Sequence, residues 1–308
     1  MKRYQKLLSL LVILSLAMCL SGCSVITITK AVKNMNSLES VSADLALDLD
    51  MSMAMMDEAT DLDITVTGPL DVDLVNEKCR ATFTVDLMGE AMDLLFYYEK
   101  ADGKHITYVY SDGGETWSKT ETPMEAGQET TSSDLKSLAM IKKLADSFEE
   151  TGTETVRGNE AVIYSGSILW KDLLADVDLS SAMEAAGEAA GSAAGTPLDL
   201  SGLDLAALGS IPVSIGFDKQ NALIVKGSAD FTETVQNLIP MVMKVAMQSM
   251  AAQSGMDAAE MEDFDLSALG FNLDIHTLTV SAELYNFDAV GEITIPPEAL
   301  AAEVAEAA

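Results

Sequence analysis

The sequence is dominated by a long run in which apolar and polar side chains alternate. Over residues 41–53 the polar positions are almost all Ser or Asp, and the apolar positions between them are Val41, Ala43, Leu45, Leu47, Leu49, Met51 and Met53. Successive side chains of a strand point to opposite faces of a sheet, so a period of two buries one face and leaves the other in solvent. The run predicts one long, half-buried β-strand.

The same alternation returns in shorter runs between turn residues. Further strands are expected at residues 62–66, 70–74, 79–87, 92–98, 105–110, 116–120, 155–157, 161–168, 213–217, 222–230, 273–284 and 292–295. Gly68-Pro69 predicts a strand edge or a bulge, because proline lacks the N–H that a ladder requires, and Asp102-Gly103 predicts a turn. The pattern predicts an α+β fold: a single domain with a large, curved antiparallel sheet covered by helices.

Helical periodicity is confined to a few segments. A short amphipathic helix is expected at residues 28–38 and another at 132–148. Two segments are expected to be low-complexity insertions: one near 180–209, rich in Ala-Ala-Gly, and one near 238–262, rich in methionine. Each insertion leads into one helical turn closed by a glycine, at 204–209 and 265–270.

The net charge is strongly negative for a chain so rich in apolar residues. The 308 residues include 49 acidic and 18 basic side chains, a net charge of −31, while 48% are hydrophobic. That apolar fraction excludes a generally disordered acidic chain. The charge argues against nucleic-acid binding, which needs clustered Lys and Arg, and disfavours docking on anionic lipids through a basic patch.

The N-terminal segment, 1–22, has the order of a secretory signal. Lys2, Arg3 and Lys6 precede a short apolar run, which ends in small residues and then Cys23. Residues 20–23, Leu-Ser-Gly-Cys, resemble the lipobox of bacterial lipoproteins. That resemblance implies cleavage before Cys23, a lipid on Cys23, and attachment to the extracytoplasmic face of the cell membrane. The leaflet, and the choice between envelope membranes, stay open.

The expected domain boundaries follow from these features. We expect a signal peptide at residues 1–22, a lipidated tether and first helix at 23–40, the sheet domain at 41–295 and a flexible tail at 296–308. With Cys19 removed and Cys23 lipidated, Cys79 has no partner for an intramolecular disulfide. Its place in a strand pattern predicts a buried, inert thiol.

Side chains for catalysis are scarce, and carboxylates are abundant. His105 and His276 are the only histidines, and no Gly-x-Ser-x-Gly motif is present, so we expect no catalytic residues. We expect no metal and no cofactor either, because the strand carboxylates lack calcium-loop spacing and are better explained as a solvated, edge-protecting face. These carboxylates are Asp44, Asp48, Asp50, Asp61, Asp63, Asp71 and Asp73.

Four segments carry a resemblance to a known family. Residues 31–44, 156–164, 217–223 and 285–296 are similar to the helix-to-strand entry, the central and late hairpins and the ending of LolA-like half-β-barrel lipoproteins, the group of LppX and LprG. The resemblance implies a half-barrel whose cavity holds a lipid or another apolar molecule. It carries over no catalytic residues.

Methionine enrichment fits such a cavity, because flexible thioether side chains adapt to irregular apolar ligands. Gap-filling in a core explains the methionines equally well. We expect Met51, Met53, Phe83, Leu94 and Phe96 to line the site.

Three functions compete. The leading hypothesis is a membrane-anchored lipoprotein that binds a hydrophobic ligand without catalysis. The alternative is a structural or protein-interaction lipoprotein of the cell envelope that has no small ligand. A hydrolase is the third. No protein partner can be named.

Overall fold

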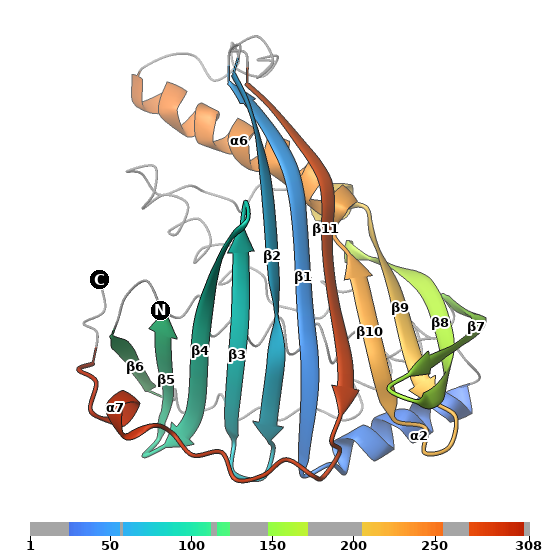
Figure 1. The fold of residues 1–308 in the computed structure, drawn as a ribbon. Helices are drawn as coiled ribbons and strands as arrows, with labels where there is room; N and C mark the ends of the chain where they lie inside the picture. The colour runs from blue at the N-terminus through green and yellow to red at the C-terminus, as the bar shows by residue number, and fades with distance from the viewer. Residues whose placement is uncertain are drawn as a thin grey trace.

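The computed structural model describes residues 25–55, 58–111, 116–123, 147–171, 205–254 and 271–304. Within them, eleven strands form one sheet in the order β6-β5-β4-β3-β2-β1-β11-β10-β9-β8-β7 (Figure 1). All neighbouring strands are antiparallel, and β6 and β7 remain at opposite edges, so the sheet does not close. The expected large antiparallel sheet is confirmed. The extent of a single domain stays a prediction.

The first six strands form a meander in chain order. They are β1 (Ser40–Met55), β2 (Glu58–Asp73), β3 (Lys78–Leu87), β4 (Glu90–Ala101), β5 (Lys104–Ser111) and β6 (Trp117–Pro123). Two of the turns have a positive φ at both central residues, Met88-Gly89 and Asp102-Gly103. Such turns match the twist of antiparallel strands, so the turn expected at Asp102-Gly103 is confirmed.

The last five strands form a second meander, and the first and last strands of the chain join the two. The second meander comprises β7 (Phe148–Val156), β8 (Asn159–Leu169), β9 (Ser210–Asp218), β10 (Ile224–Asp230) and β11 (Phe271–Tyr285). β11 lies beside β1, from Ser42 opposite Tyr285 to Met55 opposite Phe271, with one bulge after Asp50. The centre of the sheet is therefore built from opposite ends of the chain.

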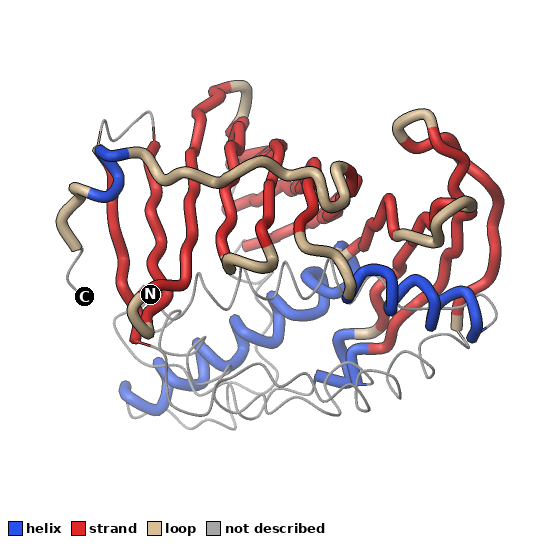
Figure 2. The backbone as a smooth tube through the Cα atoms, turned by 90° about the horizontal axis from the view of Figure 1, so that it is seen from below, coloured by secondary structure: helices blue, strands red, loops and turns tan. Residues whose placement is uncertain are grey.

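Two helices lie on one face of the sheet, which we call the helix face (Figure 2). They are α2 (Val25–Asn36) and α6 (Thr232–Ser254). A 3-10 turn, η1 (Leu205–Leu208), ends at Gly209 with φ 79°, as the sequence predicted for residues 204–209. None of the helices in the described segments is long and apolar enough to span a membrane.

The other face is crossed by residues 286–296, which we call the strap; it ends at α7 (Pro297–Leu300) (Figure 1). The backbone N–H groups of Asp288 and Val290 donate to the carbonyl and the hydroxyl oxygen of Ser40, at 2.9 and 3.2 Å. Farther along, Ile295 and Ala299 are buried against Ile106 and Tyr108 of β5. The strap therefore covers part of the face that it crosses.

Three sequence predictions need correction here. Residues 292–295 form no strand: Ile293 and Ile295 alternate because they are buried in the strap, not because they join a ladder. The flexible tail expected from residue 296 instead contains α7, and Ala299 is fully buried. Residues 238–254 of the expected insertion continue α6, with Pro240 inside the helix.

Pro69 does not mark a strand edge, because β2 lies between β1 and β3. The ladder to β3 pairs Thr67 with Thr84 and Leu70 with Ala81, and leaves out Gly68 and Pro69. This interruption accommodates a residue without an N–H inside a sheet. Several predicted features lie outside the described residues: the signal peptide, Cys23, the Ala-Ala-Gly segment, the turn at 265–270 and most of the helix expected at 132–148.

The interruption brings the backbones of β2 and β3 unusually close, which makes Gly68 a sensitive position. A Cβ on Gly68 would lie 1.9 Å from the carbonyl oxygen of Thr82. We predict that Gly68→Ala lowers the free energy of unfolding by about 2–3 kcal/mol, because the strands must separate to admit the methyl group. Urea denaturation measures the change. Gly291→Ala is the control, since no atom lies within 4 Å of its added Cβ; equal stability of the two variants would contradict the prediction.

Candidate apolar binding face

The helix face can be traced across the sheet from one buried cluster. Ala31 of α2 belongs to this cluster, and Leu47 of β1, Leu278 of β11 and Val235 of α6 pack against it. Directly opposed residues of an antiparallel pair share a face. The strand register therefore assigns the apolar residues in phase with Leu47, in β1 to β4, and Val109 of β5 to the helix face.

All five residues predicted to line the site lie on this face. Phe83 is opposite Leu94, and Phe96 lies between Ala81 and Val109. Met51 lies between Ile275 and Leu62, and Met53 between Leu273 and Thr60. Met51 and Met53 form one group, and Phe83, Leu94 and Phe96 form another. Met51 lies beside Leu62 of β2, whereas Phe83 lies at the height of Gly68, so roughly 20 Å of strand separates the two groups. The structure brings the five to one surface but not to one point.

The surface between the two groups is apolar as well. It consists of residues that alternate in step with the five predicted ones but were not among them: Leu49, Leu62, Ile64, Val66, Val85, Leu87, Met92 and Val109. The face is not fully buried: Leu87 and Met92 each keep 39% of their surface exposed, and Met53, one of the five predicted residues, keeps 38%. The helix face of β1 to β4, with Val109 of β5, is thus one continuous apolar surface that is only partly covered.

Helix α6 is fixed over the central strands by its first turns. The Thr232 hydroxyl accepts a hydrogen bond from the Leu278 N–H at 2.9 Å, and the Gln236 amide donates to the Ile275 carbonyl at 2.7 Å. The Trp170 indole N–H donates to the Thr234 hydroxyl at 2.8 Å. From β11 the helix runs across the helix face toward the β4 side (Figures 1 and 2). Its methionine-containing half thus extends over the side of the sheet that carries the apolar surface.

A separate, small pocket lies beside α2. Its volume is about 280 Å³, and it is lined by Lys30, Val162, Tyr164, Phe217, Asp218, Lys219 and Ala222. None of the five predicted residues belongs to it. Its carboxylate has a structural role: Asp218 accepts hydrogen bonds from the Gln220 and Asn221 N–H groups and so closes the β9–β10 turn.

The two histidines lie in different surroundings. His105 Nδ1 is 2.7 Å from the hydroxyl of Tyr98, whose pKa burial raises to about 12. His276 Nε2 is 3.1 Å from the Ser52 hydroxyl, and its Nδ1 is 3.9 Å from the nearer oxygen of Asp274. Ser, His and Asp are the residue types of a hydrolytic triad, but 3.9 Å is too long for the orienting hydrogen bond. The absence of catalysis stays a prediction.

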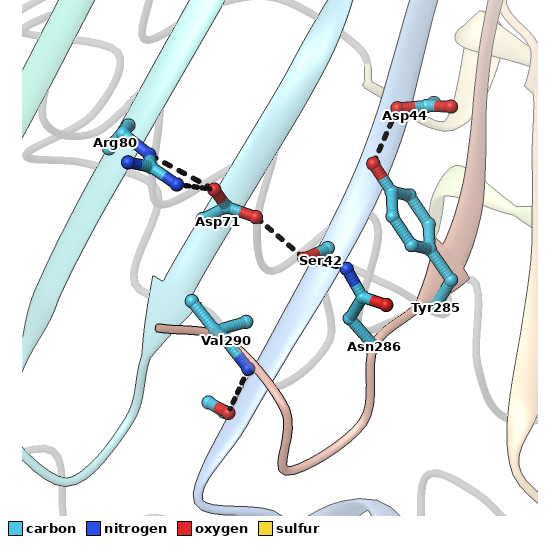
Figure 3. A network of polar contacts seen from close by, with 8 residues as sticks. Ser42, Asp44, Asp71, Arg80, Tyr285, Asn286 and Val290 are labelled. Atoms are coloured by element: carbon cyan, nitrogen blue, oxygen red, sulfur yellow. Dashed lines mark hydrogen bonds and ion pairs between the residues drawn. The ribbon is translucent and has the colours of Figure 1, made fainter. Parts of the chain in front are cut away.

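Several acidic side chains of the strap face have basic or hydroxyl partners (Figure 3). Asp71 accepts from the guanidinium of Arg80 and from the hydroxyl of Ser42, each at 2.6 Å. Asp44 accepts from Tyr285 at 3.0 Å and pairs with Arg157. Among the described residues no three His, Cys, Asp or Glu side chains form a group that could hold a metal ion.

Comparison with known proteins gives only distant similarity. No protein-family model matches the sequence, and no curated protein sequence matches it. The lipoprotein LppX of Mycobacterium tuberculosis aligns over 88% of this chain and 97% of its own, with 10% identity and a TM-score of 0.37. LprF of Mycobacterium bovis aligns over 89% and 96%, with 12% identity and a TM-score of 0.38. An outer membrane lipoprotein-sorting protein domain from Vibrio parahaemolyticus aligns over 87% and 93%, with 8% identity and a TM-score of 0.21.

LppX is one of the lipoproteins of the group that the sequence resembles. At these identities and TM-scores, the likeness assigns no ligand and no function to this chain.

Cys79 lies on the helix face, opposite Val72 and Tyr98, and is buried as predicted. Burial raises the pKa of its thiol to about 12, so the reactive thiolate is almost absent near neutral pH. We predict that a thiol reagent at pH 8 modifies Cys79 only as fast as the protein unfolds, measured on protein that lacks residues 1–23. Urea-unfolded protein is the positive control. Rapid modification under native conditions would show that the strands open at Cys79.

Proposed function

We propose that this protein is a membrane-anchored, extracytoplasmic lipoprotein that holds a lipid or another hydrophobic ligand against the helix face of β1 to β5, without catalysis. One observation carries the proposal: a continuous apolar surface on these strands keeps Met53, Leu87 and Met92 more than one-third exposed. Exposed apolar patches of this kind on protein domains are usually binding sites. An apolar ligand would remove that surface from water.

The chemistry of the surface suits a flexible ligand. Burial of apolar area contributes about 25 cal/mol per Å², so a long acyl chain laid across β1 to β4 has enough surface for tight binding. Met51, Met53 and Met92 adjust their shape at low cost because their side chains are unbranched. Phe83 and Phe96 add rigid area near the other end of the surface. The ligand is therefore proposed to be elongated and apolar.

The anchor is proposed from the lipobox at residues 20–23. A lipid on Cys23 would keep a protein of this negative charge at a membrane that its side chains alone would not hold. The anchor also gives a lipid-binding surface access to its ligand.

Leu94 and Leu95 provide a matched pair of test positions, because they are neighbours on β4, similarly half-buried, and point to opposite faces. We predict that Leu94→Gln weakens binding of a fluorescent fatty acid about tenfold, which corresponds to about 1.4 kcal/mol, the scale of one lost apolar side-chain contact. Leu95→Gln, on the strap face, should leave the affinity within about twofold. Titration of the signal-less protein measures both.

Lipid extraction and mass spectrometry of the same protein identify a bound molecule independently. Equal effects of Leu94→Gln and Leu95→Gln would contradict a site on the helix face. Protein that carries no lipid and binds no probe would favour the alternative, an envelope lipoprotein that acts through protein contacts.

A second prediction concerns the anchor alone. Cys23→Ser removes the only acceptor for the lipid in residues 20–23, so the protein should move from the membrane fraction to the soluble extracytoplasmic fraction. Fractionation followed by immunoblotting measures the shift, and mass spectrometry of the wild type should find an acylated Cys23. Wild-type protein without an acyl group, and a variant that remains on the membrane, would contradict it.

A further inference from the structure

One end of the sheet combines the start of the chain's folded part with an exposed apolar turn. Helix α2 lies along this end and leads into β1 (Figure 1). The β2–β3 turn lies beside that entry, since the Leu74 N–H donates to the Glu39 carbonyl at 2.9 Å. We call this end, with α2 and residues 74–77, the anchor rim.

The turn presents two large apolar side chains to solvent. Val75 is 66% exposed and Leu74 is 47% exposed. The turn is well ordered by hydrogen bonds: the Asp73 carboxylate accepts from the N–H groups of Val75 and Asn76 at 3.1 and 2.9 Å, and from the Asn76 amide at 2.7 Å. These bonds lower the pKa of Asp73 and keep the turn in one shape. The hydrogen-bonded turn thus keeps the side chains of Leu74 and Val75 exposed to solvent.

Charge is distributed unevenly along the strands. The end far from the anchor rim is formed by residues 46–55 of β1, 58–67 of β2 and 82–93 of β3 and β4, which contain no Lys or Arg and many carboxylates. At the anchor rim, Lys78 pairs with Glu99, Lys100 with Glu77 and Lys104 with Glu121, at 3.4, 2.7 and 2.5 Å. Three carboxylates near the anchor rim therefore have basic partners, whereas the far end has no basic side chain to offset the repulsion of its carboxylates by a negatively charged surface.

We propose that the anchor rim rests on the phospholipid bilayer, with Leu74 and Val75 inserted among the lipids and the acidic end of the sheet directed away. This inference rests on the proposed anchor at Cys23. Only Ser24 separates Cys23 from α2. Two residue steps of extended chain span roughly 7 Å, so the lipid attachment lies close to the first residue of the helix. A tether this short keeps the edge that carries α2 at the membrane surface, and burial of Leu74 and Val75 fixes which part of that edge meets the lipids.

The bilayer is a better occupant for this turn than a protein partner. A turn of two apolar residues is much smaller than a stable protein interface, which buries on the order of 1,000 Å² or more. Insertion into a bilayer needs no shape-complementary partner, and the anchor supplies a high local concentration of lipid.

The two ends of strand β3 provide a matched pair of probes. Val75 lies in the turn before β3, and Met88, which is 59% exposed, lies in the turn after it. A strand of this length separates the two turns by roughly 33 Å. Val75→Cys and Met88→Cys can each be labelled singly with an environment-sensitive fluorophore, because Cys79 is buried and the Cys23 sulfur carries the lipid. The acylated mature protein is reconstituted in phosphatidylcholine vesicles, with and without phosphatidylglycerol, and nitroxide-labelled lipids serve as quenchers.

The expected result is a blue shift and strong quenching at position 75, and neither at position 88, in both kinds of vesicle. Equal quenching at the two positions, or none at position 75 in protein whose acylation is verified by mass spectrometry, overturns the proposed orientation and leaves the anchor standing. Protein that carries no acyl group overturns the anchor and the orientation together. Val75→Asp on acylated protein labelled at Ser37→Cys, directly after α2, should reduce quenching of that label; unchanged quenching would also overturn the insertion.

Discussion

The pairing of β1 with β11 is the constraint on which the rest of the architecture depends. It joins residues from opposite ends of the described chain, from Ser42 opposite Tyr285 to Met55 opposite Phe271. Each meander can form from contacts between neighbouring strands, but the two become one sheet only through this ladder. Closing so long a loop has an entropic cost, which rises slowly with loop length. The length of the two strands allows many hydrogen bonds and side-chain pairs to offset that cost.

The same ladder determines where the apolar residues meet. Val280 is opposite Leu47, and Leu278 opposite Leu49, so the apolar phase of β1 continues into β11 and reaches the cluster beneath α2 and α6. On the strap face of this ladder, near Tyr285, the contacts are polar: Arg157 stacks on the Tyr285 ring at 3.8 Å and pairs with Asp44 and Glu283. The β7–β8 turn, at one edge of the sheet, is thereby held to the central strands. Along the β1–β11 ladder the register thus separates apolar contacts on the helix face from polar contacts on the strap face.

The sequence predicted most strands well, because most of them have an alternating apolar pattern of their own; β7 is the exception, since its seven residues between Phe148 and Val156 are all exposed. It predicted the candidate face for the same reason. Val85 and Met92 could also have been predicted, because each lies two positions from Phe83 or Leu94 and therefore on the same face of the strand. It failed where burial comes from distant contacts. Ile293 and Ile295 alternate like a strand but are buried in the strap, and the composition of residues 238–254 concealed a helix whose first turns are fixed by bonds to β11. The distance between Met51 and Phe83 on this face could not be predicted, because it depends on the register between strands, and the pattern of one segment does not determine that register.

The acidic end of the sheet shows which forces prevail in this fold. Asp50 lies directly opposite Asp63 across the β1–β2 ladder, and like charges in that position destabilise a sheet by up to about 1 kcal/mol. On the other face, Leu49 meets Ile64 and Met51 meets Leu62, and burial of each such side chain contributes about 1.5–3 kcal/mol when complete. Even at half that value, the apolar pairs outweigh the repulsion. The sheet can therefore concentrate carboxylates at one end without losing its register, because the apolar side chains that hold β1 to β2 belong to the same partly covered surface as Met53, Leu87 and Met92.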